Sequence, residues 1–123
     1  MKQTKENIYT PERGTVLSVK EETPLVRLFQ VRLNRPLSYS PGQFFMVSLW
    51  GAGEVPISVT SLQDERGIIE FCIRKAGSVT SRLFELKSGD TLWFRGPYGR
   101  SFPLEIAEQR DVIIVAGGIG IAP

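Results

Sequence analysis

The sequence predicts an all-β fold: a six-stranded antiparallel Greek-key barrel with one short helix, ending in the first strand of a truncated α/β domain. Three observations support this prediction. Short segments in which apolar and polar residues alternate recur between turn residues, as in antiparallel sheets. Only residues 77–86 show helical spacing, and residues 112–115 are apolar without alternation. We therefore expect a barrel domain at residues 1–110 and the start of a second domain at residues 111–123.

The predicted strands are short and follow one another at intervals typical of an antiparallel barrel. Turns containing proline and glycine separate them, such as Pro24 in the first connection and Pro41-Gly42 before the central hairpin. The strands are expected at residues 14–20, 25–33, 44–50, 55–61, 68–74 and 91–95, and the loop 96–99 closes the last of them.

The fourth predicted strand separates a polar face from an apolar one. Its aliphatic side chains, Val55, Ile57 and Val59, point one way, and Pro56, Ser58 and Thr60 point the other. Because proline has no N–H to donate to a neighbouring strand, this polar face is expected at a sheet edge or beside a ligand. An ordinary half-buried hairpin is the alternative interpretation.

The segment 77–86 predicts the one short helix, because Val79, Leu83 and Leu86 share a helical face. Ser78 is the expected N-cap. The first helical turn also carries the hydroxyls of Thr80 and Ser81. Unpaired N–H groups at a helix N-terminus favour a bound phosphate, so this end is a candidate anion site. A plain capped helix explains the pattern equally well.

The last residues change character again. The run 112–115 is typical of a parallel strand buried on both faces, and the glycines after it are expected to lead into a helix. We therefore expect the chain to be the front part of a longer protein, cut just inside a nucleotide-binding α/β domain. An apolar strand without a sheet is expected either to fold back along the barrel or to pair with the same segment of a second molecule. We favour the second outcome, a homodimer caused by truncation.

Composition excludes several classes of function. The 123 residues carry 15 basic and 13 acidic side chains that are scattered along the chain, which argues against nucleic acid as a partner. The chain has no histidine, which excludes a Ser-His-Asp hydrolase, and no apolar run is long enough to span a membrane. Residues 1–7 are too polar for a signal peptide or an anchor. The single Cys72 excludes an internal disulfide framework and is expected to be a small buried residue. The expected location of the protein is the cytoplasm.

Taken in order, the motifs resemble the flavin-binding domain of the ferredoxin–NADP⁺ reductase family over residues 9–123. They are Pro-Gly-Gln-Phe at 41–44, Pro-Ile-Ser-Val-Thr-Ser at 56–61, Gly-Ser-Val-Thr-Ser at 77–81 and Gly-Pro-Tyr-Gly at 96–99. A fifth, at 117–123, resembles the opening of the family's pyridine-nucleotide domain. None of these motifs is specific alone, but their ordered set is.

The resemblance implies which residues bind the cofactor. It places Ser58 near the flavin ring and the segment 77–81 at the pyrophosphate. The implied cofactor-binding residues are Pro56, Ile57, Ser58, Val59, Thr60, Arg74, Gly77, Ser78, Val79, Thr80 and Ser81. For the truncated nucleotide-binding domain they are Gly117, Gly118 and Gly120. No residue is assigned a catalytic or metal-binding role, because the flavin itself carries out the redox chemistry.

One departure refines the resemblance. Most members have Arg-x-Tyr-Ser on the flavin strand, whereas this chain has Val55-Pro56-Ile57-Ser58, so Arg74 is expected to pair with phosphate instead. The Pro-Ile-Ser form resembles the electron-transfer subunits of dihydroorotate dehydrogenase, anaerobic sulfite reductase and, above all, sulfhydrogenase (the gamma subunit). This branch implies FAD, with FMN as the alternative. It also implies NAD(P)H in the full-length protein, an iron–sulfur cluster in a downstream region, and other subunits of a redox complex as partners.

Two functions are therefore weighed. The first is the flavin module of an NAD(P)H-linked oxidoreductase subunit that passes electrons between nicotinamide and an iron–sulfur, hydrogenase or reductase partner. The second is a barrel without flavin that serves as a docking or regulatory module. The colour of the purified protein separates them, since bound flavin is yellow.

Overall fold

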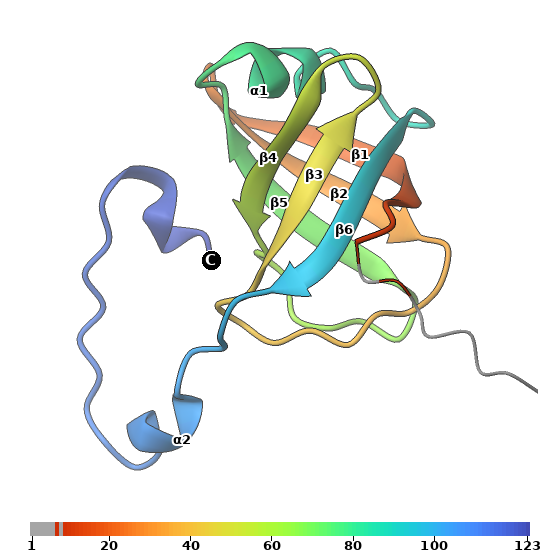
Figure 1. Ribbon diagram of the computed structural model, residues 1–123. Helices are drawn as coiled ribbons and strands as arrows, with labels where there is room; N and C mark the ends of the chain where they lie inside the picture. Colours follow the sequence, from red (N-terminus) through yellow and green to blue (C-terminus); the bar gives the residue numbers. More distant parts are fainter. Residues whose placement is uncertain (1–6, 8) are drawn as a thin grey trace, which may run out of the picture.

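The computed structural model describes residue 7 and residues 9–123 (Figure 1). Its strands are β1 (Glu12–Thr23), β2 (Val26–Leu33), β3 (Phe44–Leu49), β4 (Gly53–Ser58), β5 (Ile68–Arg74) and β6 (Thr91–Tyr98). Its helices are α1 (Ser78–Leu83), the single turn α2 (Leu104–Ala107) and a 3₁₀ turn at Gly118–Ile121. The expectation that residues 1–7 are neither a signal peptide nor an anchor falls almost entirely on residues outside the described ones.

The six strands form one antiparallel sheet in the order β4-β3-β6-β1-β2-β5. The sheet is rolled, so that β1, β2 and β5 lie behind β4, β3 and β6 (Figure 1). Its two edge strands, β4 and β5, approach each other at an isolated bridge between Val59 and Phe71. The predicted six-stranded barrel with one short helix is confirmed, and it stays partly open between these two edges.

The core fills the inside of the rolled sheet. Because side chains alternate along a strand, each strand contributes every second residue to it. Phe45 has no exposed surface, and its ring packs edge-on against Tyr39, Phe71 and Phe94 with 5.9 Å between ring centroids in each case. The other fully buried large side chains include Phe29, Ile69, Ile73, Leu83 and Leu92.

The last barrel strand is longer than predicted. β6 continues through Gly96 and Pro97 to Tyr98, where the sequence predicted a loop. The pairing with β3 is irregular here, because Phe44 lies opposite Tyr98 while Met46 lies opposite Arg95. The extra residue on β6 forms a bulge, which lets the strand accommodate glycine and proline. Gly96 has a φ of 137°, and a Cβ there would lie 3.0 Å from the Phe45 ring, so only glycine fits.

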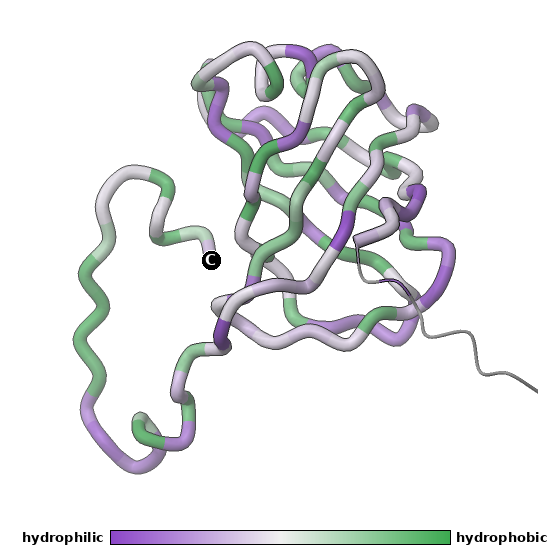
Figure 2. Tube along the Cα trace, in the orientation of Figure 1, coloured by the Kyte–Doolittle hydropathy of each residue, from purple (hydrophilic) through white to green (hydrophobic). Residues whose placement is uncertain are grey.

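The prediction of a strand after residue 111 is wrong for this chain. Val112, Ile113, Ile114 and Val115 are 59–92% exposed and belong to no strand. Figure 2 shows this apolar stretch standing away from the barrel. A parallel strand needs neighbours on both sides, and the part of the chain described here supplies none beside this segment. In the described part of the chain, no helix has the length and apolar character needed to cross a membrane.

Candidate functional site

The unpaired edge of β4 is the first part of the candidate site. Val59 donates its N–H to the carbonyl of Gln43 beside β3, and Thr60 donates its N–H to Glu70 of β5 at 3.0 Å. Backbone groups of alternate residues in a strand point to the same side. The backbone groups of Pro56 and Ser58 therefore point away from β3, as the N–H of Thr60 does. The expectation that Pro56 lies at a sheet edge is confirmed.

The side chains of this strand divide as the sequence predicts. Pro56 and Ser58 are exposed, whereas Ile57 packs against the core and Val59 is 1% exposed. The Thr60 hydroxyl accepts a hydrogen bond from the N–H of Cys72 at 3.2 Å, so it ties the end of this segment to β5. Ser58 is thus the hydroxyl that this strand presents outwards.

Cys72 is half-buried rather than buried, because it lies on the outer face of β5 while its neighbours Phe71 and Ile73 point into the core. Partial burial raises the pKa of the Cys72 thiol above its ordinary value. The thiol is therefore protonated at neutral pH.

The N-terminal end of α1 is the second part of the site. Gly77, not Ser78, is the N-cap, and Ser81 is the first residue to donate back to its carbonyl, at 2.9 Å. Thr80 is 8% exposed, and its hydroxyl accepts hydrogen bonds from the N–H groups of Ala76 (2.8 Å) and Gly77 (2.9 Å). The buried Thr80 hydroxyl therefore fixes the turn, in place of the Ser78 side chain that the sequence predicted as the cap.

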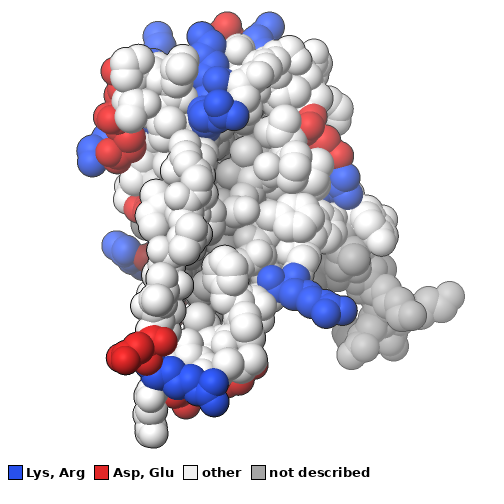
Figure 3. Space-filling view, turned by 90° about the vertical axis from the view of Figure 1, so that its left-hand side faces the viewer, with Lys and Arg blue, Asp and Glu red and all other residues white. Residues whose placement is uncertain are grey.

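The two parts meet at the tip of the β3–β4 hairpin. A Cβ at Gly53 would lie 3.3 Å from Cγ2 of Val79, so the start of β4 touches the first turn of α1. Arg74 is exposed at the end of β5, three residues before the helix cap. Figure 3 shows Lys and Arg side chains interspersed with Asp and Glu at the upper end of this face, where α1 lies, and a mostly uncharged middle. The structure thus brings the predicted β4 and α1 residues to one side of the barrel.

The predicted nucleotide-binding glycines lie elsewhere. Gly117, Gly118 and Gly120 are all exposed in the segment beyond α2, where the 3₁₀ turn begins. They are joined to the barrel by the extended residues 111–117 and are not part of the β4–α1 site.

Sequence reasoning missed an ion pair beside this site. Arg95 of β6 donates two hydrogen bonds to the Glu54 carboxylate of β4, at 3.0 and 2.6 Å, and a third to the Tyr98 hydroxyl at 3.2 Å. The hydrogen bonds from Arg95 lower the pKa of Glu54, and the same bonds raise the pKa of Arg95. The pair spans the intervening strand β3, so only the order of strands in the sheet could have revealed it.

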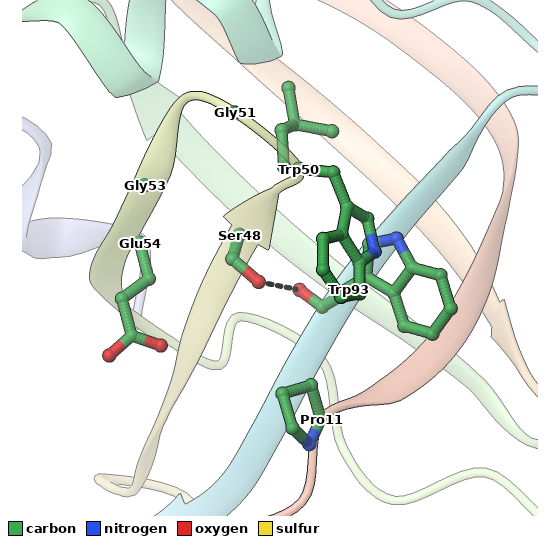
Figure 4. A pocket seen from close by; sticks show the side chains of 8 residues that line it. Pro11, Ser48, Trp50, Gly51, Gly53, Glu54 and Trp93 are labelled. Carbon is green, nitrogen blue, oxygen red and sulfur yellow. Dashed lines mark hydrogen bonds between the residues drawn. The ribbon is translucent and has the colours of Figure 1, made fainter.

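A shallow cavity of about 280 Å³ lies next to this ion pair, on the outside of the sheet (Figure 4). Trp50 and Trp93 form its aromatic side, with ring centroids 5.6 Å apart and nearly perpendicular planes. Trp50 is 80% exposed at the hairpin tip. The other lining residues are Pro11, Ser48, Leu49, Gly51, Gly53 and Glu54. None of the predicted cofactor-binding residues lines this cavity.

Comparison with known proteins places the chain in a family. The sequence profile of the oxidoreductase FAD-binding domain matches residues 14–102. The chain is 42% identical to sulfhydrogenase 1 subunit gamma of Pyrococcus furiosus over 96% of its own length and 42% of that protein. It is 46% identical to the probable dihydroorotate dehydrogenase B electron transfer subunit of Thermococcus kodakarensis over 75% of its length and 36% of that protein. The chain thus spans about two-fifths of the length of these curated relatives.

Solved structures share the fold. The ferredoxin reductase in carbazole 1,9a-dioxygenase superimposes with a TM-score of 0.69 and 25% identity, covering 73% of this chain and 29% of that one. An NADH-dependent reduced ferredoxin-NADP oxidoreductase also gives a TM-score of 0.69, over 75% of this chain and 36% of that one. Its 24% identity supports the similarity of fold alone.

Proposed function

The chain belongs to the oxidoreductase FAD-binding domain family, and from this premise we propose that FAD binds along the unpaired edge of β4, with its pyrophosphate at the N-terminal end of α1. One observation carries the proposal. The edge and the helix end, predicted separately from the sequence, meet where Gly53 touches Val79. A backbone edge with open donors and acceptors suits the flavin ring, and free helical N–H groups suit phosphate.

The residues of the β4 edge and of the α1 end fit FAD, although some of them would contribute backbone groups rather than side chains. The Ser58 hydroxyl and the first-turn N–H groups of α1 are placed to donate hydrogen bonds, and Arg74 supplies positive charge nearby. Thr60 and Thr80 use their hydroxyls inside the protein, so they would act by fixing the backbone around the site. Val59, which is 1% exposed, would fix the position of this strand from the core, and the half-buried Ile57 would contribute apolar surface. The bound flavin would supply the redox chemistry, and the protein would hold and orient it.

For the full-length protein we propose the role of an electron-transfer subunit. In this role electrons pass between NAD(P)H and a partner subunit of a redox complex, through an iron–sulfur cluster outside residues 1–123. The names of the relatives, a sulfhydrogenase subunit gamma and a dihydroorotate dehydrogenase electron transfer subunit, support this role. We further propose that residues 111–123, with Gly117, Gly118 and Gly120, open an NAD(P)-binding domain. The single free Cys72 fits the reducing conditions of the cytoplasm, where we place the protein.

The test is a titration of the purified chain, freed of any bound flavin, with FAD and in parallel with FMN. Flavin fluorescence and tryptophan fluorescence report binding, because Trp50 lies three residues from Gly53 at the hairpin tip and Trp93 packs against it. We expect saturable binding of FAD at one site per chain, and weaker binding of FMN, which lacks the pyrophosphate.

Competition by ADP, which carries the pyrophosphate without the flavin ring, is the matching control for the α1 end of the site. A chain that stays colourless and does not respond to either flavin would contradict the proposal. That result would favour a docking or regulatory module without flavin.

The apolar segment 112–115 supports a separate proposal, that the chain associates with itself. Four exposed aliphatic side chains in sequence, with unpaired backbone groups, form a template for pairing with another strand. We expect the 123-residue chain to sediment as a dimer or larger species at high concentration. A chain ending at Gln109 should remain monomeric. Equal, monomeric sedimentation of both chains would rule out this segment as an association element.

A further inference from the structure

The pairing between the edge strands β4 and β5 stops close to Ser58. Thr60 donates its N–H to the carbonyl of Glu70 at 3.0 Å, beside the isolated bridge between the two edges. In a regular antiparallel ladder the Glu70 N–H would bond back to the Thr60 carbonyl. The next hydrogen-bonded pair along the ladder would join Cys72 to Ser58. A continued ladder would therefore cover the edge that the flavin is proposed to use.

Side-chain hydroxyls accept both of these β5 N–H groups. The Glu70 N–H donates to Oγ of Ser61 at 2.9 Å, and the Cys72 N–H donates to Oγ1 of Thr60 at 3.2 Å. In the described part of the chain, no backbone N–H donates to the Thr60 carbonyl. Each hydroxyl thus competes with a backbone carbonyl for the same donor, and this competition works against further pairing of the two strands.

Tyr39 holds the Ser61 hydroxyl in this position. Tyr39 lies in the connection between β2 and β3 and is 7% exposed. Its hydroxyl donates to the Leu62 carbonyl at 2.9 Å and lies 3.2 Å from Oγ of Ser61. Because each hydroxyl has one proton, Ser61 donates its own to the Tyr39 oxygen and turns its lone pairs towards Glu70. Burial raises the pKa of Tyr39, so this arrangement persists at neutral pH.

We propose that Ser61, oriented by Tyr39, is a positioning residue for the flavin ring: its hydroxyl ends the pairing of β5 with β4 and so keeps the edge at Pro56 and Ser58 open. The inference rests on the proposed function, but only on its β4 edge and not on where the pyrophosphate binds. A purely structural role, in which the hydroxyls close the barrel, would change stability without changing the affinity of the folded protein.

The experiment measures the Kd for riboflavin, which carries the flavin ring without phosphate, in the parent chain and in variants of Ser61. Ser61→Ala frees the Glu70 N–H to bond to the Thr60 carbonyl, so we expect affinity to fall about fivefold. Ser61→Thr keeps the hydroxyl and should bind riboflavin as the parent does. Tyr39→Phe should also weaken binding, with little further loss in the double variant with Ser61→Ala, because both act through one hydroxyl.

Hydrogen exchange of the Ser58 amide, followed by NMR in the flavin-free chain, distinguishes the two roles. If the ladder extends in Ser61→Ala, the Ser58 N–H gains a partner on β5 and should exchange more slowly than in the parent. A simple loss of stability would make the same amide exchange faster, because local opening becomes easier.

Ser88→Ala is the matched control. The Ser88 hydroxyl donates to the carbonyl of Leu17 at 2.8 Å on β1, which is adjacent to neither β4 nor β5 in the sheet. This variant also removes one hydroxyl-to-backbone hydrogen bond and should leave riboflavin affinity unchanged. Thermal unfolding of each variant reports its stability, and Tyr39→Phe decides the question if Ser61→Ala does not fold.

Two results would overturn the inference while leaving the proposed flavin site intact. One is parent-like riboflavin affinity in Ser61→Ala, and the other is a loss that Ser61→Thr shares, accompanied by faster exchange of the Ser58 amide. A parent chain that binds neither riboflavin nor FAD would instead overturn the proposed function.

Discussion

Replacing Phe45 by alanine is expected to lower the free energy of unfolding by about 3–5 kcal/mol. Phe45 is fully buried and packs against three other aromatic rings, from the β2–β3 connection, β5 and β6. Its removal therefore loses both apolar burial and three edge-on ring contacts. The surrounding sheet is held by its ladders and can collapse only partly into the space. Urea unfolding followed by circular dichroism measures the loss as a lower midpoint with an unchanged slope.

Phe102→Ala is the control for this prediction. It removes the same atoms from a side chain that is 50% exposed, so the expected loss is below about 1 kcal/mol. A loss at Phe45 as small as that at Phe102 would show that the three ring contacts do not stabilise the core as the structure indicates.

Replacing Thr80 by valine is expected to cost about 1–3 kcal/mol of stability and to weaken FAD binding. Valine has nearly the same shape as threonine but cannot accept the hydrogen bonds from Ala76 and Gly77. These two N–H groups would lose their partner, and the turn that begins α1 would loosen. Because the proposed phosphate donors lie in the same turn, affinity and stability should fall together. Thermal unfolding and FAD titration of the same preparation measure both quantities.

Thr91→Val provides the comparison. Thr91 begins β6, and none of the described side-chain hydrogen bonds involves it, so valine should leave both stability and FAD affinity close to those of the parent. If Thr80→Val lost stability but kept the parent's FAD affinity, α1 would be a structural helix and its N-terminal end would not hold the phosphates.

The sequence predicted the strands well because their signal is local. The alternation of Val55, Ile57 and Val59 with polar residues reports the two faces of β4 without knowledge of its neighbours. The length of β6 was not predictable in this way. Its continuation through Gly96 and Pro97 depends on a bulge opposite β3, which is a property of the pairing between two strands. The run 112–115 reads as a strand for the same local reason, yet a strand requires partners that the described residues do not provide.

The sequence predicts which segments form the candidate site, but not the directions and contacts of their side chains. The motifs predict that Ser58 and the first turn of α1 belong to one site. The direction in which each hydroxyl points depends on how its side chain packs, which the motifs do not show. The Thr80 hydroxyl points inward because it accepts hydrogen bonds from the N–H groups of Ala76 and Gly77 in the turn that begins α1. Glu54 and Arg95 are 41 residues apart, and their contact follows only from the placement of β6 beside β3.

Pro56 also affects whether the unpaired edge of β4 can pair with a strand of another polypeptide. An unpaired strand edge attracts any extended chain, and strands that add to such edges lead to aggregation. Pro56 lies in the middle of the outward series Glu54, Pro56 and Ser58, where its ring replaces the donor that an incoming strand would need. A flat cofactor that needs only one or two hydrogen bonds can still use Ser58, whereas a continuous ladder cannot form. The same proline that marks the edge in the sequence would thus keep it available to a small ligand and closed to another polypeptide.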